Sequence, residues 1–421
     1  MVQRIAILPD VYLTAVTTDK FKTECISLNL LRPLCREEAA MNALLGGILL
    51  RGSKRCPDLT AVSTALEELY GAEIGNLIRR KGEVQCIGLF ADCLCDEAVG
   101  EPIFAQTAAM AAELLLDPVT DGGVFREDYI AQEKENLIRS IRARMNGKRV
   151  YAHTQMVKVM FRDEAFGVDR LGEESDVNAI TPENLFAHYR RVLATSRVEI
   201  CYTGRKSPEA VAAILREALA ALPRETCVSV GTVFVPRAER TQEIIERMDV
   251  TQGKLCMGFR TGRSVRDENW RASALMNAVF GGGLTSKLFL NVREKLSLCY
   301  YASSSIEKYK GFLCVSSGID FDKFDVAKAA ILEQLEACRR GEITEKELQM
   351  AKDQVALALR TVCDNPSRLD DFHLGNAVLG REVTPEELRK KNDVLTVGDL
   401  ADAAKDVTLD TVFFLRGEAE Q

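Results

Sequence analysis

The sequence predicts an α+β fold of two homologous domains, each a mostly antiparallel sheet with helices packed on one face. Three observations lead to this prediction. The second half of the 421-residue chain repeats segments of the first half in the same order. Within each half, strand-like segments come early and late while helical segments fill the middle, a separation typical of α+β layers. A proline-containing stretch without helical periodicity separates the halves.

The internal repeat rests on two pairs of segments. Ala179–Gly204 and Val394–Gly417 align at an offset of 215 residues, with a gap of two residues near the end. Both segments predict a helix opened by a threonine cap, followed by a strand that ends at glycine. The amphipathic helices predicted over Phe125–Ile141 and Ile343–Leu359 align at an offset of 218. Two matches at nearly the same offset indicate a duplication.

The first half contains a definite order of predicted elements and ends at a connector, and the connector gives the domain boundaries. Alternating or apolar runs predict strands, and amphipathic runs predict helices. The strands are expected over 11–18, 25–31, 73–80, 83–91 and 198–204, with helices over 37–50 and 59–69 and two or three more before the last strand. A connector begins at Pro223. The predicted boundaries are an N-terminal domain over 1–225, a linker over 226–240 and a C-terminal domain over 241–421.

Composition and charge exclude several functional classes. The formal net charge of −7 disfavours nucleic-acid binding, which needs a basic surface. The N-terminus does not resemble a signal peptide, and no segment approaches the roughly 20 apolar residues that span a bilayer. The thirteen cysteines are scattered, and the one close pair, Cys93 and Cys95, does not form a CxxC motif. We therefore expect a cytoplasmic protein with buried free thiols and no membrane partner.

The most distinctive stretch is Phe280–Ser305, with the sequence FGGGLTSKLFLNVREKLSLCYYASSS. Its glycines, Gly281–Gly283, predict a turn after the helix WRASALMNAVF. Thr285 or Ser286 is suited to cap the next helix, and an alternating strand follows. The glycines do not predict a phosphate-binding loop, because no Lys-Ser/Thr pair follows them and no parallel βαβ unit surrounds them.

Taken as a whole, this stretch resembles the C-terminal domain of the insulinase/pitrilysin family of zinc metallopeptidases, which includes mitochondrial processing peptidases and bacterial processing-protease-like proteins. The family pattern is a glycine-rich turn, a Ser-Arg-Leu-Phe-like helix start, Arg-Glu-Lys, and a tyrosine seven residues after the arginine. Here these are GGG, SKLF, Arg293–Lys295 and Tyr300. The flanking segments QGKLCMGFRTG and GFLCVSSGID also match, and the resemblance runs through most of the chain.

The resemblance implies a LuxS/metallohydrolase-like clamshell whose halves close around an extended peptide. It implies that Arg293 and Tyr300 reach the substrate, opposite the zinc site of an N-terminal half. A guanidinium is a permanent donor for a peptide carbonyl, and a phenol can donate to an oxyanion. The alternative is that Arg293 forms a surface ion pair with Glu294 or another acid and that Tyr300 is a core residue.

The zinc helix of the family carries His-x-x-Glu-His, in which two histidines hold the metal and the glutamate acts as general base. An apolar run and a Lys-Gly-Thr-like turn follow it. Here the corresponding turn is Arg51–Ser53, so the motif positions are Ala43, Gly46 and Gly47. The resemblance therefore implies a degenerate metal site, with no catalytic residue and no metal ligand of its own.

Other residues offer no obvious replacement for the motif. The only three histidines, His153, His188 and His373, are far from this helix in sequence and are expected to be core or surface residues. The third ligand of the family is a glutamate on a later helix. Either Glu133 or Glu135 could occupy that place, and the sequence does not decide between them.

The resemblance suggests a non-catalytic bacterial member of the family that binds a peptide or protein substrate. It would pair with a homologue carrying an intact His-x-x-Glu-His and supply Arg293 and Tyr300 to the partner's site. No cofactor is expected in this chain, and zinc is expected in the partner.

Within the family, the chain looks most similar to inactive members from Gram-positive bacteria that are named as associated with the aminopentanol modification of elongation factor P. Two alternatives stay open. One is a stand-alone peptide-binding or scaffold protein, and the other, less favoured, is a self-sufficient zinc peptidase with unusual ligands.

Overall fold

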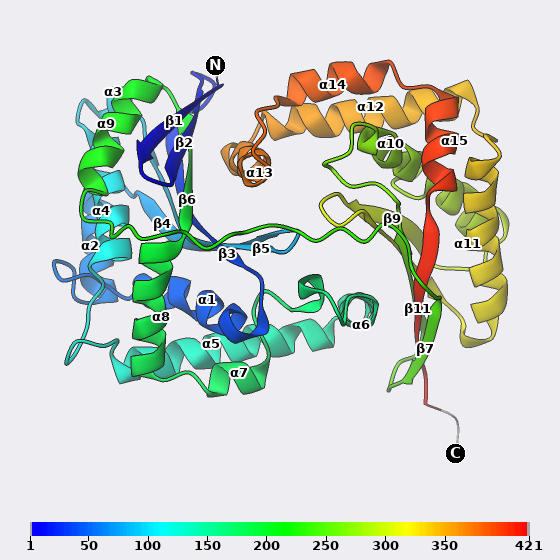
Figure 1. Ribbon diagram of the computed structural model, residues 1–421, viewed down its shortest axis with the longest axis horizontal. Helices are drawn as coiled ribbons and strands as arrows, with labels where there is room; N and C mark the ends of the chain where they lie inside the picture. The colour runs from blue at the N-terminus through cyan, green and yellow to red at the C-terminus, as the bar shows by residue number, and fades with distance from the viewer. Residues whose placement is uncertain (1, 419–421) are drawn as a thin grey trace. The chain divides into compact units, whose positions relative to one another are not determined.

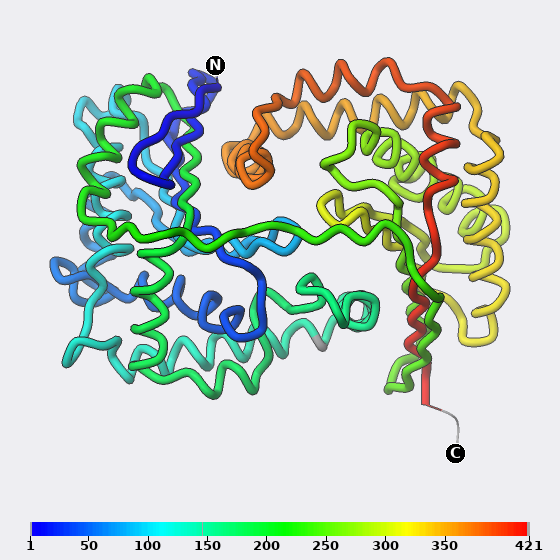
Figure 2. The backbone as a smooth tube through the Cα atoms, in the orientation of Figure 1, coloured from blue at the N-terminus to red at the C-terminus, as the bar shows by residue number. Residues whose placement is uncertain are grey.

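Two β-sheets organise the structure, each within its own unit (Figures 1 and 2). The computed structural model describes residues 2–418, apart from the side chain of Met145. Unit 1 comprises Met1–Arg142, Val168–Gly231 and Asp364–Glu382, and unit 2 comprises Ala143–Gly167, Thr232–Cys363 and Val383–Gln421.

The sheet of unit 1 has the strand order β1-β2-β6-β3-β5-β4, and β2 with β6 is its one parallel pair among the described residues. Because β4 ends this order, its outer edge pairs with no other strand of residues 2–418. The strands are β1 (Val2–Leu8), β2 (Val11–Thr17), β3 (Thr23–Pro33), β4 (Glu73–Lys81), β5 (Val84–Leu94) and β6 (Arg197–Gly204).

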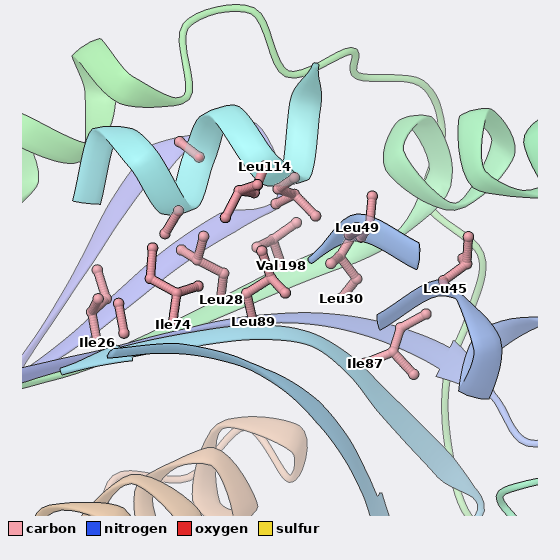
Figure 3. Close-up of a cluster of buried hydrophobic side chains, with 14 of the residues drawn as sticks. Ile26, Leu28, Leu30, Leu45, Leu49, Ile74, Ile87, Leu89, Leu114 and Val198 are labelled. Atoms are coloured by element: carbon pink, nitrogen blue, oxygen red, sulfur yellow. The ribbon is translucent and has the colours of Figure 1, made fainter. Parts of the chain in front are cut away.

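Helices cover one face of this sheet, where alternate side chains of the strands form the main core of unit 1. Figure 3 shows these side chains, with Leu28 and Leu30 of β3 and Leu89 of β5 among them. Burial of each such side chain contributes roughly 1.5–3 kcal/mol to folding. The helices that contact the strands on this face are α1 (Arg36–Leu49), α4 (Ile103–Leu116), α8 (Pro182–Thr195) and α9 (Pro208–Ala218). The other helices are α2 (Leu59–Glu68), α3 (Asp96–Val99), α5 (Glu127–Asn146) and α7 (Glu174–Asn178).

The sheet of unit 2 has the order β7-β11-β8-β10-β9, and β11 runs parallel to β7. Its strands are β7 (Gln242–Arg247), β8 (Gly253–Arg260), β9 (Tyr301–Glu307), β10 (Phe312–Ile319) and β11 (Thr408–Arg416). The helices of its main core are α10 (Trp270–Phe280), α11 (Phe324–Arg339), α12 (Glu345–Val362) and α15 (Val397–Lys405). Unit 2 also contains the helix α14 (Pro385–Asp393), the 3₁₀ turns η1 (Ala165–Gly167) and η3 (Phe321–Lys323), and the π-helix η2 (Leu288–Lys295).

The predicted duplication agrees with the two sheets. Without β1, the first sheet reads β2-β6-β3-β5-β4, and the second reads β7-β11-β8-β10-β9, with the parallel pair in the same place. Even a detail outside the sheets repeats. Lys134 Nζ donates to the carbonyl oxygen of Asn178 at 2.9 Å, and Lys352 Nζ donates to that of Asp393 at 2.8 Å. The α+β prediction with two homologous, mostly antiparallel sheets is therefore confirmed.

Each unit also contains one helix from the other half of the linear sequence. Helix α6 (Lys148–Met160) packs on β8 and β11 in unit 2, and α13 (Pro366–Val378) packs on β3 and β6 in unit 1. These helices lie at equivalent positions of the repeat and cover the sheet face opposite the main core. The linear boundaries at 1–225, 226–240 and 241–421 stay a prediction.

Buried ion pairs fix the segment 143–167 within unit 2. Glu164 accepts from Arg260 Nη2 at 2.7 Å and from Lys310 Nζ at 2.5 Å. Arg260 also donates through Nε to Asp410 Oδ2 at 2.8 Å. Because Lys310 and Arg260 are almost fully buried, the carboxylate of Glu164 is needed to compensate two buried cations.

The structure differs locally from the sequence prediction. The strand β1 was not expected, and it forms a hairpin with β2 through a turn in which Asp10 has φ of 56°, a conformation that aspartate tolerates better than most residues. The helix expected after Gly281–Gly283 is a π-helix, in which the amide of Leu296 donates to the carbonyl of Asn291 five residues earlier.

Candidate functional site

Helix α1 carries the three positions that the family resemblance assigns to the degenerate motif. Ala43, Gly46 and Gly47 share one side of the helix, because residues three and four apart are neighbours. A Cβ atom at Gly46 would lie 2.7 Å from Cβ of Asn76 on β4, and one at Gly47 would lie 2.5 Å from Oε2 of Glu133 on α5. The neighbouring elements thus occupy the space that larger side chains on α1 would need.

Glu133 faces the motif helix, whereas Glu135 is exposed. Of the two candidates, only Glu133 therefore lies beside the predicted motif positions, and its assignment to the third-ligand place stays a prediction. The Glu133 carboxylate accepts from Arg51 Nε at 2.8 Å, and Arg51 Nη2 bonds the same oxygen. Both side chains are mostly buried, with exposed fractions of 12% and 16%. A permanently charged guanidinium therefore compensates the carboxylate beside the degenerate motif.

We expect Gly46→Ala to lower the free energy of unfolding by about 1–3 kcal/mol, because the added methyl group overpacks against Asn76. This loss would outweigh the gain of about 1 kcal/mol in helix propensity. Urea denaturation monitored by circular dichroism measures the change. Gly398→Ala, at an exposed position of α15 with no atom closer than 3.6 Å to the new Cβ, is the matched control and should be neutral or stabilising. Equal stability of Gly46→Ala and wild type would contradict close packing here.

A buried hydrogen-bond network lies next to the motif on α1 and engages His188. His188 Nε2 lies 2.8 Å from Oδ1 of Asn42, and Arg191 Nη2 lies 2.8 Å from His188 Nδ1. Since arginine only donates, Nδ1 must accept and Nε2 must carry the proton. Burial lowers the pKa of His188 to about 4, so the ring is neutral at pH 7. Both ring nitrogens have protein partners, and His188 is a structural residue.

The other histidines lie elsewhere. His153 is on α6 of unit 2, where its ring centroid is 6.3 Å from that of Phe312. His373 is buried on α13 of unit 1, and burial lowers its pKa to about 4. Over residues 2–418, no group of three or more His, Cys, Asp or Glu side chains is arranged to hold a metal ion.

Arg293 and Tyr300 both reach the surface of unit 2. The Arg293 side chain is 39% exposed, lies 4.8 Å from the ring centroid of Phe289, and places Nε 3.6 Å from Oε1 of Glu294. The contact with Glu294 is the one expected for a surface ion pair. Tyr300 is 61% exposed, so it is not a core residue. Its hydroxyl donates to Oδ1 of Asp320 at 3.1 Å, and this hydrogen bond raises the pKa of Tyr300.

The three glycines before this region serve close packing. A Cβ atom at Gly281 would lie 2.5 Å from Ser304 Oγ, and one at Gly283 would lie 2.7 Å from Gln354 Oε1. Of the two candidate caps, Ser286 accepts from the amide of Phe289 at 3.4 Å, while Lys287, at the N-cap of η2, makes no side-chain capping bond.

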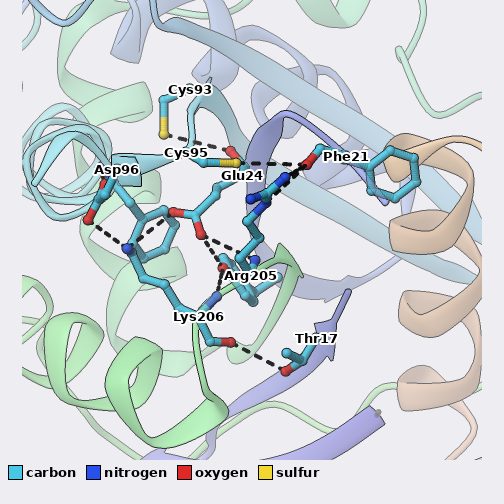
Figure 4. A network of polar contacts seen from close by, with 10 residues as sticks. Thr17, Phe21, Glu24, Cys93, Cys95, Asp96, Arg205 and Lys206 are labelled. Carbon is cyan, nitrogen blue, oxygen red and sulfur yellow. Dashed lines mark hydrogen bonds and ion pairs between the residues drawn. The ribbon is translucent and has the colours of Figure 1, made fainter. Parts of the chain in front are cut away.

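Cys93 and Cys95 donate to backbone carbonyls, as Figure 4 shows. The acceptors are the carbonyls of Glu24 and Phe21, at 3.7 and 3.9 Å. Burial raises the pKa of Cys93 to about 12, so its thiol is neutral. Nearby, Lys206 Nζ lies 2.6 Å from Asp96 Oδ2 and 3.5 Å from Glu24 Oε2. All thirteen cysteines are free, and this pair is structural.

Comparisons with known proteins agree with these features. Residues 179–355 match the family model described as the peptidase M16 inactive domain. The chain is 30% identical over 404 residues to the "probable inactive metalloprotease YmfF" of Bacillus subtilis strain 168, covering 96% of this chain and 95% of that protein.

Two crystal structures share the fold over the whole chain. A conserved protein from Enterococcus faecalis V583 has a TM-score of 0.92 and 27% identity, covering 100% of this chain and 99% of that one. A peptidase M16 inactive domain from Pseudomonas fluorescens has a TM-score of 0.79 and 18% identity, covering 100% and 98%.

In residues 2–418, no helix has the length and apolar character needed to cross a membrane. The predicted motif positions on α1 hold one alanine and two glycines, and the relative that matches over nearly the whole length is itself described as a probable inactive metalloprotease. The chain therefore belongs to the peptidase M16, or insulinase, family as an inactive metalloprotease homologue.

Proposed function

We propose that this chain is a non-catalytic subunit that binds an extended peptide or protein and pairs with an M16 homologue carrying an intact His-x-x-Glu-His. One contrast supports the proposal most. On α1 the motif positions are filled by small residues and Glu133 is bound to Arg51, whereas in unit 2 Arg293 and Tyr300 remain accessible. Zinc would then belong to the partner, and this chain would need no cofactor.

In such a pair, unit 2 would supply substrate-binding groups to the partner's site. The Arg293 guanidinium would donate to a carbonyl of the bound peptide. The Tyr300 hydroxyl would turn from Asp320 toward the oxyanion that develops at the scissile carbonyl. Both groups are hydrogen-bond donors, as this role requires.

The matching experiment is co-expression of this chain with the homologue, followed by co-purification, zinc analysis and a peptidase assay. We expect a stable complex that cleaves peptides faster than either chain alone, with zinc only in the partner. Replacing the motif glutamate of the partner by glutamine should abolish cleavage. Absence of a complex would contradict the proposal, and stoichiometric zinc with chelator-sensitive cleavage in this chain alone would favour a self-sufficient peptidase.

The free edge of β4 favours the alternative of a stand-alone peptide-binding protein. This edge lies beside the motif helix, where Asn76 packs against Gly46, and its backbone groups can pair with an extended peptide. Peptide binding by this chain without any homologue, together with unchanged peptidase activity in a mixture of the two chains, would support the alternative.

We extend the proposal to a cytoplasmic processing or maturation step connected with the aminopentanol modification of elongation factor P. Its basis is the family resemblance together with the relative from a Gram-positive bacterium. Mass spectrometry of elongation factor P from cells that lack the gene for this chain tests this connection. Loss of the modification is expected, and an unchanged mass would contradict the connection.

A further inference from the structure

Unit 1 contains a cavity of about 410 Å³ between its sheet and helix α13. The cavity lies on the sheet face opposite α1 and α4, since Cys25 and Ser27 line it while the alternating Leu28 points into the main core. The volume is in the range of small-ligand sites. The residues assigned above to the degenerate motif and to substrate contact do not line it.

One row of side chains crosses the cavity wall from strand to strand. The register places Glu73 opposite Asp92, Asp92 opposite Cys25, and Cys25 opposite Thr203, on β4, β5, β3 and β6. Glu73 and Asp92 are therefore like charges directly opposite each other, an arrangement that destabilises a sheet unless a cation compensates it.

No cation of the described residues compensates these two carboxylates. Neither Glu73 nor Asp92 forms an ion pair within residues 2–418, and the buried Oδ1 of Asp92 has no hydrogen-bond partner there. The neighbouring Cys25 adds no positive charge, and burial, followed by the Asp92 carboxylate, raises the pKa of its thiol. An unsatisfied buried carboxylate oxygen carries a free-energy cost that a bound donor would remove.

The other charged groups of the cavity are already paired. Arg79 forms an ion pair with Asp370 of α13, and Ser27 donates to the same carboxylate. These contacts hold α13 on the sheet. They pair the Arg79 guanidinium with Asp370 rather than with Glu73 or Asp92. Glu73 and Asp92 are left without an ion-pair partner among residues 2–418; Glu73 is exposed to solvent, and Asp92 is partly buried with Oδ1 unbonded.

The rest of the wall is apolar. The ring of Phe90 lies over Gly75, which has no side chain to displace it, and Leu77 and Pro366 also line the cavity. Such a surface suits a hydrocarbon stem next to the charged end. A bare metal ion fits less well, because residues 2–418 contain no cluster of three or more potential metal-binding side chains.

We propose that this cavity binds an organic cation, an ammonium or guanidinium group on an apolar stem, whose charged head pairs with Asp92 and Glu73. Charge-assisted hydrogen bonds from the head would satisfy the carboxylates, and the stem would lie along Phe90 and Leu77. The cation can be a free amine or the side chain of a lysine or arginine in a peptide. This proposal does not depend on pairing with a catalytic homologue.

Isothermal titration calorimetry of the full chain at low ionic strength tests the proposal. The cationic probes are n-pentylammonium and n-butylguanidinium, and n-pentanol is the neutral probe. We expect at least one cation to bind one-to-one and n-pentanol not to bind. Asp92→Asn and Glu73→Gln should each weaken binding by about tenfold or more, because each removes a charged acceptor. Asp322→Asn, an exposed residue of unit 2, is the matched control and should bind as the wild type does.

Acetylated tripeptides containing lysine or norleucine at the centre distinguish the sources of the cation. Preferential binding of the lysine peptide would identify a side chain as the ligand, and preference for the free cations would identify a small amine. Glu73→Gln keeps the test valid if Asp92→Asn does not fold, because Glu73 is exposed. The proposal is wrong if no cationic probe binds, or if both variants keep the affinity of the wild type.

Discussion

Replacing Tyr300 by phenylalanine is expected to lower kcat of the proposed heterodimer by about 100- to 1,000-fold, the usual effect of removing one oxyanion donor. The hydroxyl would act in the transition state only, so KM should change little. Arg293→Ala should instead raise KM, because a guanidinium that holds a peptide carbonyl acts already in the ground state. Steady-state kinetics with a fluorogenic peptide separates the two effects.

Both variants should still assemble with the homologue, which size-exclusion chromatography checks. Tyr70→Phe is the matched control, since Tyr70 of unit 1 is also exposed and its hydroxyl donates to Glu101 at 3.2 Å. It should leave kcat and KM unchanged. Wild-type kinetics for the double variant Arg293→Ala with Tyr300→Phe would show that unit 2 does not contribute to the partner's site.

Glu164→Gln is expected to lower the free energy of unfolding by about 3–5 kcal/mol, the range found when one partner of a buried ion pair is removed. The amide would remove the negative charge that pairs with both Arg260 and Lys310, while Asp410 would stay paired with Arg260. Urea denaturation at pH 7 measures the loss. Glu243→Gln is the matched control because Glu243 pairs with Lys328 at the surface, and its effect should stay below about 1 kcal/mol.

The same ion pairs predict a pH dependence. Burial acts to raise the pKa of Glu164, but the hydrogen bonds from Arg260 and Lys310 outweigh it and hold the pKa below its ordinary value. This contribution to stability is fully present above the ordinary glutamate pKa and is lost as the pH falls through the lower folded-state pKa. Wild type should therefore lose more stability in acid than Glu164→Gln, and parallel pH profiles would contradict this account.

The sequence was sufficient for the α+β class and the duplication, because these follow from periodicity and repeats. The motif positions on α1 come from the family resemblance, counted back from Arg51, and stay a prediction. The sequence could not choose between Glu133 and Glu135. Side chains two positions apart on a helix point in different directions. Only the packing of α5 shows which of the two glutamates faces α1. The ion pair between Arg51 and Glu133 was missed because its members lie 82 residues apart.

The location of α6 and α13 was also beyond sequence analysis. An apolar stripe shows that a helix packs against something, but it does not identify the sheet. At Gly258, a Cβ atom would lie 2.6 Å from the sulfur of Met160, so α6 packs closely on β8 although about 100 residues separate them in sequence. Such long-range contacts leave no local pattern.

The reciprocal placement of α6 and α13 also bears on how the duplicated chain arose. When two copies of one protein each donate the same element to the other, the result is a domain-swapped dimer. Here the two copies are the halves of a single chain, and the donated elements are equivalent helices of the repeat. In an ancestor of half this length, the same arrangement would be an exchange of this helix between the two copies of a dimer. Fusion of the two genes would then have made that exchange intramolecular and permanent.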